Sequence, residues 1–304
     1  MLNALTVDLE DWPQAVLDPS LPITDRVVGN VDRLLGLLDR HSVRATFFAL
    51  GKVCERHPQL LPLIQSAGHE IASHGYGHEL MYRLTPRQFE EDVRRSIEII
   101  GSQTGRRPLG YRAPAFSITR ESLWGGPILA SLGFRYSSSI FPIRKARYGI
   151  HDAPRIPHRW SNCDLVEFPL TTLRVFGCHV PVCGGGYMRL LPWWVHAHAI
   201  GSMNAGGHPA VVYLHPYELA SDEVDLFRRA GLRFSTSRRV MQSLWRSRVL
   251  PRLTRLFEAF RFAPITQVFE AINLPGLCPA APGTVPELSP PCLSLVPPPT
   301  CTAT

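Results

Sequence analysis

The sequence predicts an α/β fold whose parallel sheet extends from residue 5 to about residue 219. Two observations support this prediction. Short apolar stretches of strand length alternate with amphipathic stretches of helix length, which is typical of βαβ units. Polar residues suited to catalysis, namely Asp8, His74, Arg112 and His215, lie at the ends of four apolar stretches. Because the carboxyl ends of parallel strands meet at one edge, we expect these side chains to converge.

Seven strands are predicted along the chain. Each is a short apolar segment bounded by polar or turn-forming residues, and together they cover residues 5–7, 45–50, 70–73, 110–112, 134–137, 165–168 and 210–214. An early helix is indicated by apolar residues at helical spacing: Val31, Leu34, Leu35 and Leu38.

The best-defined helix is predicted from Pro86 to about residue 100. Thr85 is placed to cap it, Pro86 suits the first helical position, and Gln88 completes a capping box. Apolar residues at helical spacing form the stripe expected to be buried: Phe89, Val93, Ile97 and Ile100. Gly101 is expected to end the helix.

Beyond residue 220 the character of the sequence changes. Apolar residues at helical spacing predict a helical extension over residues 221–265, with a kink at Pro251. Residues 266–304 are predicted to form a disordered tail, because nine prolines and few charged residues occur between Pro275 and Thr304.

The net charge of +7 is unevenly distributed. Seven arginines lie between Thr236 and Phe262, where Glu258 is the single acid, and this segment therefore carries +6. A uniformly basic nucleic-acid-binding protein would not show this pattern, so no nucleic-acid partner is expected. The Arg-rich helix is a candidate for peripheral contact with anionic lipid or acidic polysaccharide, and a solvated amphipathic face is the simpler interpretation.

The sequence suggests neither a membrane span nor a signal peptide. No apolar run approaches the ~18 to 20 residues of a spanning helix, and the first residues lack a basic and then apolar leader. A cytoplasmic location is therefore expected, with peripheral contact at the inner membrane as an option. The seven cysteines are irregularly spaced, so we expect free thiols.

Two histidines four residues apart, His74 and His78, form the first candidate metal-binding element. This spacing places both imidazoles on one side if the segment forms a helical turn. Neutral imidazole is a good ligand for zinc and similar metals, although such a pair alone is a weak signal. Two small residues between the histidines, Gly75 and Gly77, and the acids near the first strand strengthen the interpretation.

Three acids, Asp8, Glu10 and Asp11, lie at the end of the first predicted strand. Three carboxyl groups so close together are costly unless a cation neutralises them. A polar exit from the strand is the structural explanation. The functional one assigns one carboxylate to a metal and another to the role of general base. Asp8 and Glu10 lie on the same face of an extended strand.

Five motifs in this order resemble those of the NodB-type polysaccharide deacetylases, carbohydrate esterase family 4. They occupy residues 6–11, 45–51, 73–78, 111–114 and 213–216. Within that family the chain is most similar to the exosortase-associated (PEP-CTERM locus) deacetylases, which carry a DUF3473 extension that residues 181–192 resemble. The resemblance spans about residues 3–262. It implies a distorted (β/α) barrel, here assigned to residues 1–220, with a DUF3473-like insertion from about residue 150.

The resemblance also implies a divalent metal, most commonly zinc, held by one acid and two histidines. His74 and His78 match the histidine ligands. The acidic motif has an extra residue between its acids, which leaves two registers: Asp8 as base with Glu10 as ligand, which we prefer, or Glu10 as base with Asp11 as ligand.

Further roles are implied by the same resemblance. Arg112 resembles the arginine that orients the base, and His215 the general acid that protonates the leaving amine. Substrate contacts are assigned to three residues: Pro114, Leu214 and Tyr187, with Leu214 beside the acetyl methyl. The aspartate that often partners the acid histidine is missing, and Ser137 takes its place in the sequence.

The function implied is hydrolysis of N-acetyl groups from amino sugars of a polysaccharide or a lipid-linked precursor, in exopolysaccharide biosynthesis. Hydrolysis of a small amide on the same fold is one alternative. A carbohydrate-binding protein that has lost turnover is another, motivated by the missing aspartate. A cluster on a later predicted helix, Trp193, Trp194, His196 and His198, is interpreted as helix packing rather than as a sugar platform.

Overall fold

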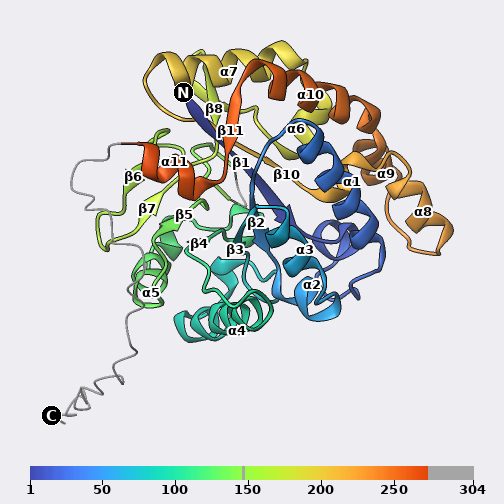
Figure 1. Ribbon diagram of the computed structural model, residues 1–304, viewed down its shortest axis with the longest axis horizontal. Coiled ribbons are helices and arrows are strands. Elements are labelled where there is room, and N and C mark those ends of the chain that lie inside the picture. The colour runs from blue at the N-terminus through green and yellow to red at the C-terminus, as the bar shows by residue number, and fades with distance from the viewer. Residues whose placement is uncertain (146–147, 273–304) are drawn as a thin grey trace, which may run out of the picture. The chain divides into compact units, whose positions relative to one another are not determined.

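The computed structural model of the protein describes residues 1–145 and 148–272 (Figure 1). The predicted tail beyond Pro275 lies outside the described residues. Residues Met1–Ile272 form one compact unit, so the expected helical extension is part of the same body as the barrel. None of the described helices is long and apolar enough to cross a membrane.

The sheet is built around β1 (Leu2–Leu9), which lies at the centre of Figure 1. Its strand order is β10 (Val211–Leu214), β1, β2 (Thr46–Ala49), β3 (Glu70–Ser73), β4 (Gly110–Tyr111), β5 (Tyr136–Ser137), β7 (Val166–Glu167) and β6 (His158–Arg159). All neighbours are parallel except β6 and β7. All seven predicted strands are therefore confirmed.

The sheet curls into an incomplete barrel. The backbone N–H of Thr171, which follows β7, donates a hydrogen bond of 3.3 Å to the carbonyl of Val211 in β10, and the Val211 N–H donates to Thr171 Oγ1 at 2.7 Å. These bonds connect the two far sides of the sheet without a regular ladder. The predicted distorted (β/α) barrel is thus confirmed.

Residues of β1 alternate between the two faces of the sheet. Leu5, Val7 and Leu9 pack outward into the core between the sheet and the helices, whereas Thr6 and Asp8 point inward. The outer layer is formed by eleven described helices: α1 (Arg26–Arg40), α2 (Gly51–Arg56), α3 (Leu60–Ser66), α4 (Pro86–Thr104), α5 (Gly125–Ser131), α6 (Gly185–Leu190), α7 (Trp193–Ala205), α8 (Glu223–Arg229), α9 (Thr236–Ser243), α10 (Val249–Ala259) and α11 (Ile265–Ala271).

Helix α4 confirms the predicted capping box but not the predicted end. Thr85 Oγ1 accepts from the Gln88 N–H, and Gln88 Oε1 accepts from the Thr85 N–H. The helix continues past Gly101, because one interior glycine costs only about 1 kcal/mol, and ends at Gly105, whose φ of 68° is left-handed.

The C-terminal region is helical as expected, but the kink is not at Pro251. Pro251 lies in the first turn of α10, where a missing N–H removes no helical hydrogen bond. The break falls at Trp245, which has a φ of 56° and separates α9 from the short helix η6 (Arg246–Arg248).

The chain then returns to the amino-terminal ends of the strands. Strand β11 (Arg261–Ala263) pairs with the first residues of β1, and α11 covers the starts of β2 and β3. The Ile265 N–H donates to Thr46 Oγ1 at 2.7 Å, and the Thr266 N–H donates to Glu70 Oε2 at 3.1 Å. Residues 266–271 are therefore folded, although we assigned them to the tail. The apolar stripe of α11 consists of Ile265, Val268 and Phe269.

Candidate active site

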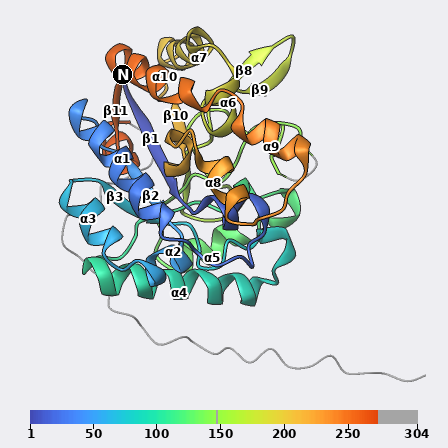
Figure 2. The same cartoon turned by 90° about the vertical axis from the view of Figure 1, so that its right-hand side faces the viewer.

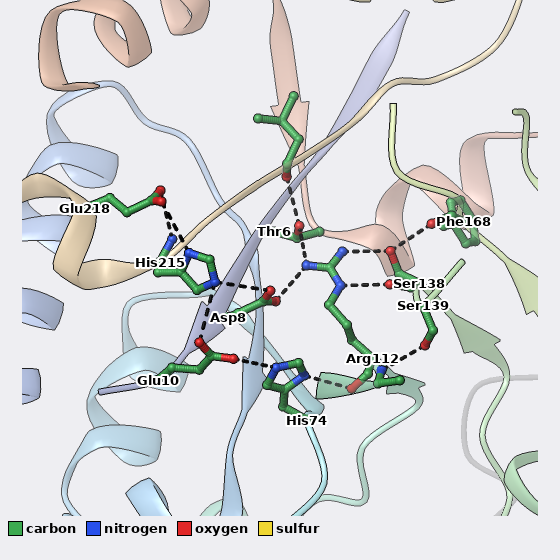
Figure 3. A network of polar contacts seen from close by, with 12 residues as sticks. Thr6, Asp8, Glu10, His74, Arg112, Ser138, Ser139, Phe168, His215 and Glu218 are labelled. Carbon is green, nitrogen blue, oxygen red and sulfur yellow. Dashed lines mark hydrogen bonds and ion pairs between the residues drawn. The ribbon is translucent and has the colours of Figure 1, made fainter. Parts of the chain in front are cut away.

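The side chains expected at one mouth do meet there (Figure 3). Asp8 and Glu10 come from the end of β1, His74 from the end of β3, Arg112 from the end of β4 and His215 from the end of β10. All five side chains are buried or nearly so, with His215 the most exposed at 15%. The convergence predicted from parallel strand ends is confirmed.

Glu10, His74 and His78 form the one group of three ligand side chains close enough to hold a metal among the described residues. Glu10 Oε1 lies 2.8 Å from the Nε2 atoms of both histidines. Burial alone raises the pKa of Glu10, but the neighbouring histidines hold it well below its usual range.

The hydrogen bonding of His74 shows that the group fits a cation. Its Nδ1 lies 2.8 Å from the carbonyl oxygen of Arg112, so the ring donates its N–H there and directs the Nε2 lone pair toward Glu10. A second imidazole nitrogen, from His78, faces the same carboxylate oxygen. Two nitrogens and one carboxylate directed at a single point form a donor set suited to zinc or a similar divalent metal.

Asp11 is placed away from this group, which favours the first register. Its Oδ2 accepts a hydrogen bond of 2.6 Å from the Thr24 N–H, and burial raises its pKa. The carboxylate that faces the histidines is that of Glu10.

The sequence analysis places His74 and His78 on one side of a helical turn, but the structure has no helix there. Residues 74–78 form a bend whose backbone is held by Asp92 of α4, with the Tyr76 N–H donating at 2.8 Å and the Gly77 N–H at 2.9 Å. Gly75 has a φ of 72°, and a Cβ there would lie 2.6 Å from Asp92 Oδ2. His78 also adopts a positive φ, 64°.

Sequence reasoning missed Asp92. No local pattern links it to the histidines, because it lies on the helix that follows their loop. The loop is also packed against the start of α2, where the Gly51 N–H donates to the Gly75 carbonyl at 2.9 Å. A Cβ at Gly51 would lie 2.9 Å from Tyr76 Cα, so this close approach requires glycine.

Arg112 fixes Asp8 from inside the barrel. Its Nη1 donates to Asp8 Oδ1 at 2.7 Å and to Thr6 Oγ1 at 2.9 Å. Ser138 accepts from Nε through its carbonyl and from Nη2 through its hydroxyl. The guanidinium is fully buried and lies 4.1 Å from the centre of the Phe48 ring. This network holds one oxygen of Asp8 and leaves Oδ2 on the side of His215, 3.8 Å from its Nε2.

His215 has a buried carboxylate partner that the sequence analysis missed. Glu218 Oε1 lies 3.5 Å from His215 Nδ1, and Glu218 Oε2 accepts from the His215 backbone N–H at 3.4 Å. The Tyr217 ring stacks on the imidazole, with centroids 4.8 Å apart. Burial lowers the pKa of His215, but the carboxylates of Glu10, Glu218 and Asp8 raise it to about 9.

The expectation that Ser137 replaces the missing aspartate is wrong. Ser137 Oγ donates to Ser139 Oγ at 2.8 Å, within the wall behind Arg112. Glu218 supplies the carboxylate instead. The signal was present locally, because Glu218 follows His215 by three residues, a spacing that brings side chains together in a tight helical turn.

Leu214 is not available to a substrate. It is fully buried and packs in the core between sheet and helices, on the same face as its strand neighbour Val7. Alternation along β10 places Tyr213 inward and Leu214 outward. Pro114 is buried at the start of a short helix, and Tyr187 is half-buried on α6, with burial and Tyr148 raising its pKa to about 12. The substrate contacts of these two residues stay predictions.

Packing explains part of the aromatic and histidine cluster on α7. His196 is buried and bonds to the carbonyls of Val182 and Leu191, as the packing interpretation predicted. Trp194, in contrast, is 60% exposed. The four described cysteines are free thiols, as expected.

Comparison with known families agrees with this geometry. Residues 19–137 match the family described as polysaccharide deacetylase, and residues 138–270 match a domain of unknown function, DUF3473. The chain therefore carries a polysaccharide deacetylase domain followed by a DUF3473 domain. Asp8 and Glu10 precede both matched segments, whereas His74, His78 and Arg112 lie in the first.

Characterised relatives cover only part of the chain. A peptidoglycan deacetylase of Helicobacter pylori is 33% identical over 137 residues, 44% of this chain and 43% of the relative. A peptidoglycan-N-acetylglucosamine deacetylase of Bacillus cereus is 30% identical over 30% of this chain and 33% of the relative. The chain thus spans less than half the length of either curated relative.

A solved structure supports the fold over almost the whole chain. The crystal structure of a putative polysaccharide deacetylase from Mycobacterium smegmatis superposes with a TM-score of 0.61 and 24% identity, covering 94% of each chain.

The DUF3473 segment completes the barrel. Strands β6, β7, β10 and β11 all lie within residues 138–270 and belong to the same sheet as β1–β5. His215 and Glu218 also come from this segment. The site is therefore assembled from both matched segments and from β1.

Proposed function

We propose that this protein is a metal-dependent hydrolase that removes N-acetyl groups from the amino sugars of a polysaccharide. The observation that carries the proposal is the placement of two proton-transfer groups, Asp8 and His215, beside the Glu10–His74–His78 group. His215 Nε2 lies 3.5 Å from Glu10 Oε2 and 3.8 Å from Asp8 Oδ2.

The metal is zinc in this proposal, held by Glu10, His74 and His78. When bound, the ion supplies Lewis-acid polarisation of the acetamide carbonyl and of the attacking water. The His74 N–H bond to the Arg112 carbonyl fixes the ring in the orientation that presents Nε2.

Asp8 acts as the general base. Its Oδ2 takes the proton from water as the water oxygen forms a bond to the acetamide carbon. Arg112 holds the other carboxylate oxygen at 2.7 Å and thereby fixes the direction in which Oδ2 faces. The same arginine links the base to the wall formed by Ser138.

His215 acts as the general acid. It donates a proton from Nε2 to the nitrogen of the acetamide as the carbon–nitrogen bond breaks, which releases acetate and leaves a free amine on the sugar. The proton that Asp8 accepted and the one that His215 donated balance over the reaction. Glu218 on the Nδ1 side keeps the ring oriented and favours the protonated form.

Several comparisons support a carbohydrate substrate. Both curated relatives described above are named as peptidoglycan deacetylases, and residues 19–137 match a polysaccharide deacetylase family. We place the reaction in exopolysaccharide biosynthesis, on a polysaccharide or its lipid-linked precursor in the cytoplasm, because the chain resembles deacetylases of exosortase-associated loci. Glu218, 3.5 Å from His215 Nδ1, offers the carboxylate that the missing aspartate would supply, which favours an active enzyme over an inactive homologue.

Acetate release from N-acetylated chito-oligosaccharides tests this function. The wild-type protein loaded with zinc is expected to release acetate, and both chelator treatment and His74→Ala are expected to abolish the release. His198→Ala, an exposed histidine on α7, is the matched control and should keep full activity. Equal acetate release in all samples would exclude the proposed site, and turnover of small soluble amides without any turnover of acetylated sugars would exclude the proposed substrate.

A further inference from the structure

Helix α9 has no partner on its outer side. None of its residues is buried, and the apolar side chains of Val240 and Met241 are 56% and 54% exposed. The helix is nevertheless well anchored at its end, where Arg189 Nη1 donates to the carbonyls of Met241 and Gln242 at 2.9 Å. Exposed apolar side chains on an ordered helix are typical of a contact surface.

The exposed surface continues from α9 to the starts of α10 and α7. Val240 and Trp245 line one hollow of about 430 Å³, together with Arg239. The Arg248 guanidinium lies 4.3 Å from the centre of the Trp245 ring. A second hollow of about 340 Å³ then joins Arg248 to Trp193 and two further arginines, Arg252 and Arg255. We call these residues together the Trp–Arg surface.

The arginines of the second hollow carry uncompensated charge. Within the described chain, no ion pair connects Arg248, Arg252 or Arg255 to an acid. Arg252 Nη1 donates to the carbonyls of Met188 and Arg189, which fixes its position without neutralising it. Arg239, in the first hollow, pairs with Asp225 at 3.4 Å. Three positive groups thus surround one hollow that Trp193 also lines, an arrangement that favours anionic groups.

From these observations we propose that the Trp–Arg surface docks the protein onto an anionic phospholipid membrane. Arginine guanidinium groups bind phosphate in a bidentate manner, which matches a layer of phospholipid headgroups. Tryptophan favours the membrane interface, where an apolar ring and a polar N–H are both accommodated. Trp193 and Trp245 are 36% and 41% exposed, and Trp194 next to them is 60% exposed. Charge and apolar surface together are what peripheral membrane binding requires.

One edge of the surface, at the end of α9, is connected to the segment that follows the acids of β1. Trp12, which follows the acids at the end of β1, donates through Nε1 to Gln242 of α9 at 3.5 Å. In both Figure 1 and Figure 2, α7 and α10 lie on the side of the molecule opposite α4. Docking through this surface would keep the protein at a membrane that carries lipid-linked substrates, a consequence that rests on the proposed function.

Sedimentation with vesicles tests the docking surface without any substrate. The wild-type protein is expected to bind vesicles of phosphatidylcholine and phosphatidylglycerol in a 7:3 ratio and not vesicles of phosphatidylcholine alone. The double variant Arg248→Gln, Arg255→Gln should bind about 30-fold more weakly, since each basic side chain near an anionic membrane contributes roughly 5-fold. Trp193→Ser with Trp245→Ser should also weaken binding and abolish a blue shift of tryptophan fluorescence.

The matched control is Arg87→Gln, Arg94→Gln on the exposed face of α4, which lowers the net charge by the same amount. An equal loss of vesicle binding in both arginine variants would overturn the proposal, because it would reflect only total charge. A fluorescence response to inorganic phosphate without vesicle binding would also overturn the proposal. Binding to polygalacturonate without vesicle binding would do the same. Acetate release from a soluble oligosaccharide should be unchanged in the surface variants, so failure of the proposed function and failure of docking are distinguishable.

Discussion

Glu218 Oε1 lies 3.5 Å from Nδ1 of His215, on the opposite side of the imidazole from Glu10 and Asp8. The ring is thus held between a carboxylate that orients it and the group that is proposed to hold the metal. Glu218 is only 3% exposed, so water does not compete strongly for this contact. Among the described residues, Glu218 forms no hydrogen bond or ion pair with Glu10, His74 or His78, so we expect it to act on the reaction through His215.

Glu218→Gln should lower kcat by about 10- to 100-fold and leave KM nearly unchanged, because loss of an orienting partner affects the proton transfer and not substrate binding. Glu218→Asp should recover part of the loss. Steady-state kinetics of acetate release measures both values. Glu91→Gln, an exposed acid on α4, is the control. A rise in KM with unchanged kcat would show that Glu218 contributes to binding instead.

Asp92→Ala should weaken zinc binding by about 10- to 100-fold, because Asp92 holds the backbone of the bend that presents His74 and His78. Competition with a chromophoric chelator gives the affinity. Glu98→Ala removes an exposed acid from the same helix and should leave the affinity unchanged. If Asp92→Ala binds zinc as tightly as the wild type, the bend does not depend on this carboxylate.

His69 should make the fold sensitive to acid. It is 6% exposed, its Nδ1 accepts from the Ala45 N–H at 3.1 Å, and burial together with Arg44 lowers its pKa to about 4. A histidine with a lowered folded-state pKa contributes stability above its unfolded pKa of about 6.5, and this contribution is lost as the pH falls toward 4. At pH 5 the expected loss is about 2 kcal/mol.

Urea unfolding at pH 7.5 and pH 5 measures this effect. The difference in unfolding free energy between the two pH values should shrink in His69→Gln and stay unchanged in His198→Gln. The same pH difference in His69→Gln as in the wild type would assign the acid sensitivity to other groups.

Phe269→Ala should destabilise the barrel by about 3 kcal/mol, because Phe269 is buried against Phe168 and lies under Arg135. Phe176→Ala removes the same ring from a fully exposed position and should have no measurable effect. Chemical denaturation compares the two variants. Equal midpoints would show that α11 adds little to the barrel.

The strands and the mouth of the barrel could be predicted because they depend on local pattern. Each of the seven predicted strands is marked by a run of apolar residues, and the polar residue after the run marks its carboxyl end. Four strands were not predicted, because each contains partly or fully exposed residues and none is a run of buried apolar ones: β6, β8 (Thr172–Val175), β9 (Cys178–Pro181) and β11. The position of α11 depends on partners such as Thr46 that are about 200 residues away in sequence.

The residues of the site could also be predicted in part from the strand pattern. Its five polar side chains follow strands, so topology alone brought them together. The bend of His74 and His78 was not predictable, because it is imposed by Asp92 from another element. The outward direction of Leu214 could have been predicted, since strand alternation places it opposite Tyr213.

The most direct test of the site is a comparison of zinc content and activity in three variants of neighbouring acids. Asp8→Asn should bind one zinc ion per chain and lose about 1,000-fold in kcat, because it removes the base and keeps the ligands. Glu10→Gln should weaken zinc binding by more than about 100-fold, because it removes a ligand and not only a residue that orients one. Asp11→Asn should keep both zinc and activity. Loss of zinc in Asp11→Asn with retention in Glu10→Gln would contradict the proposed site.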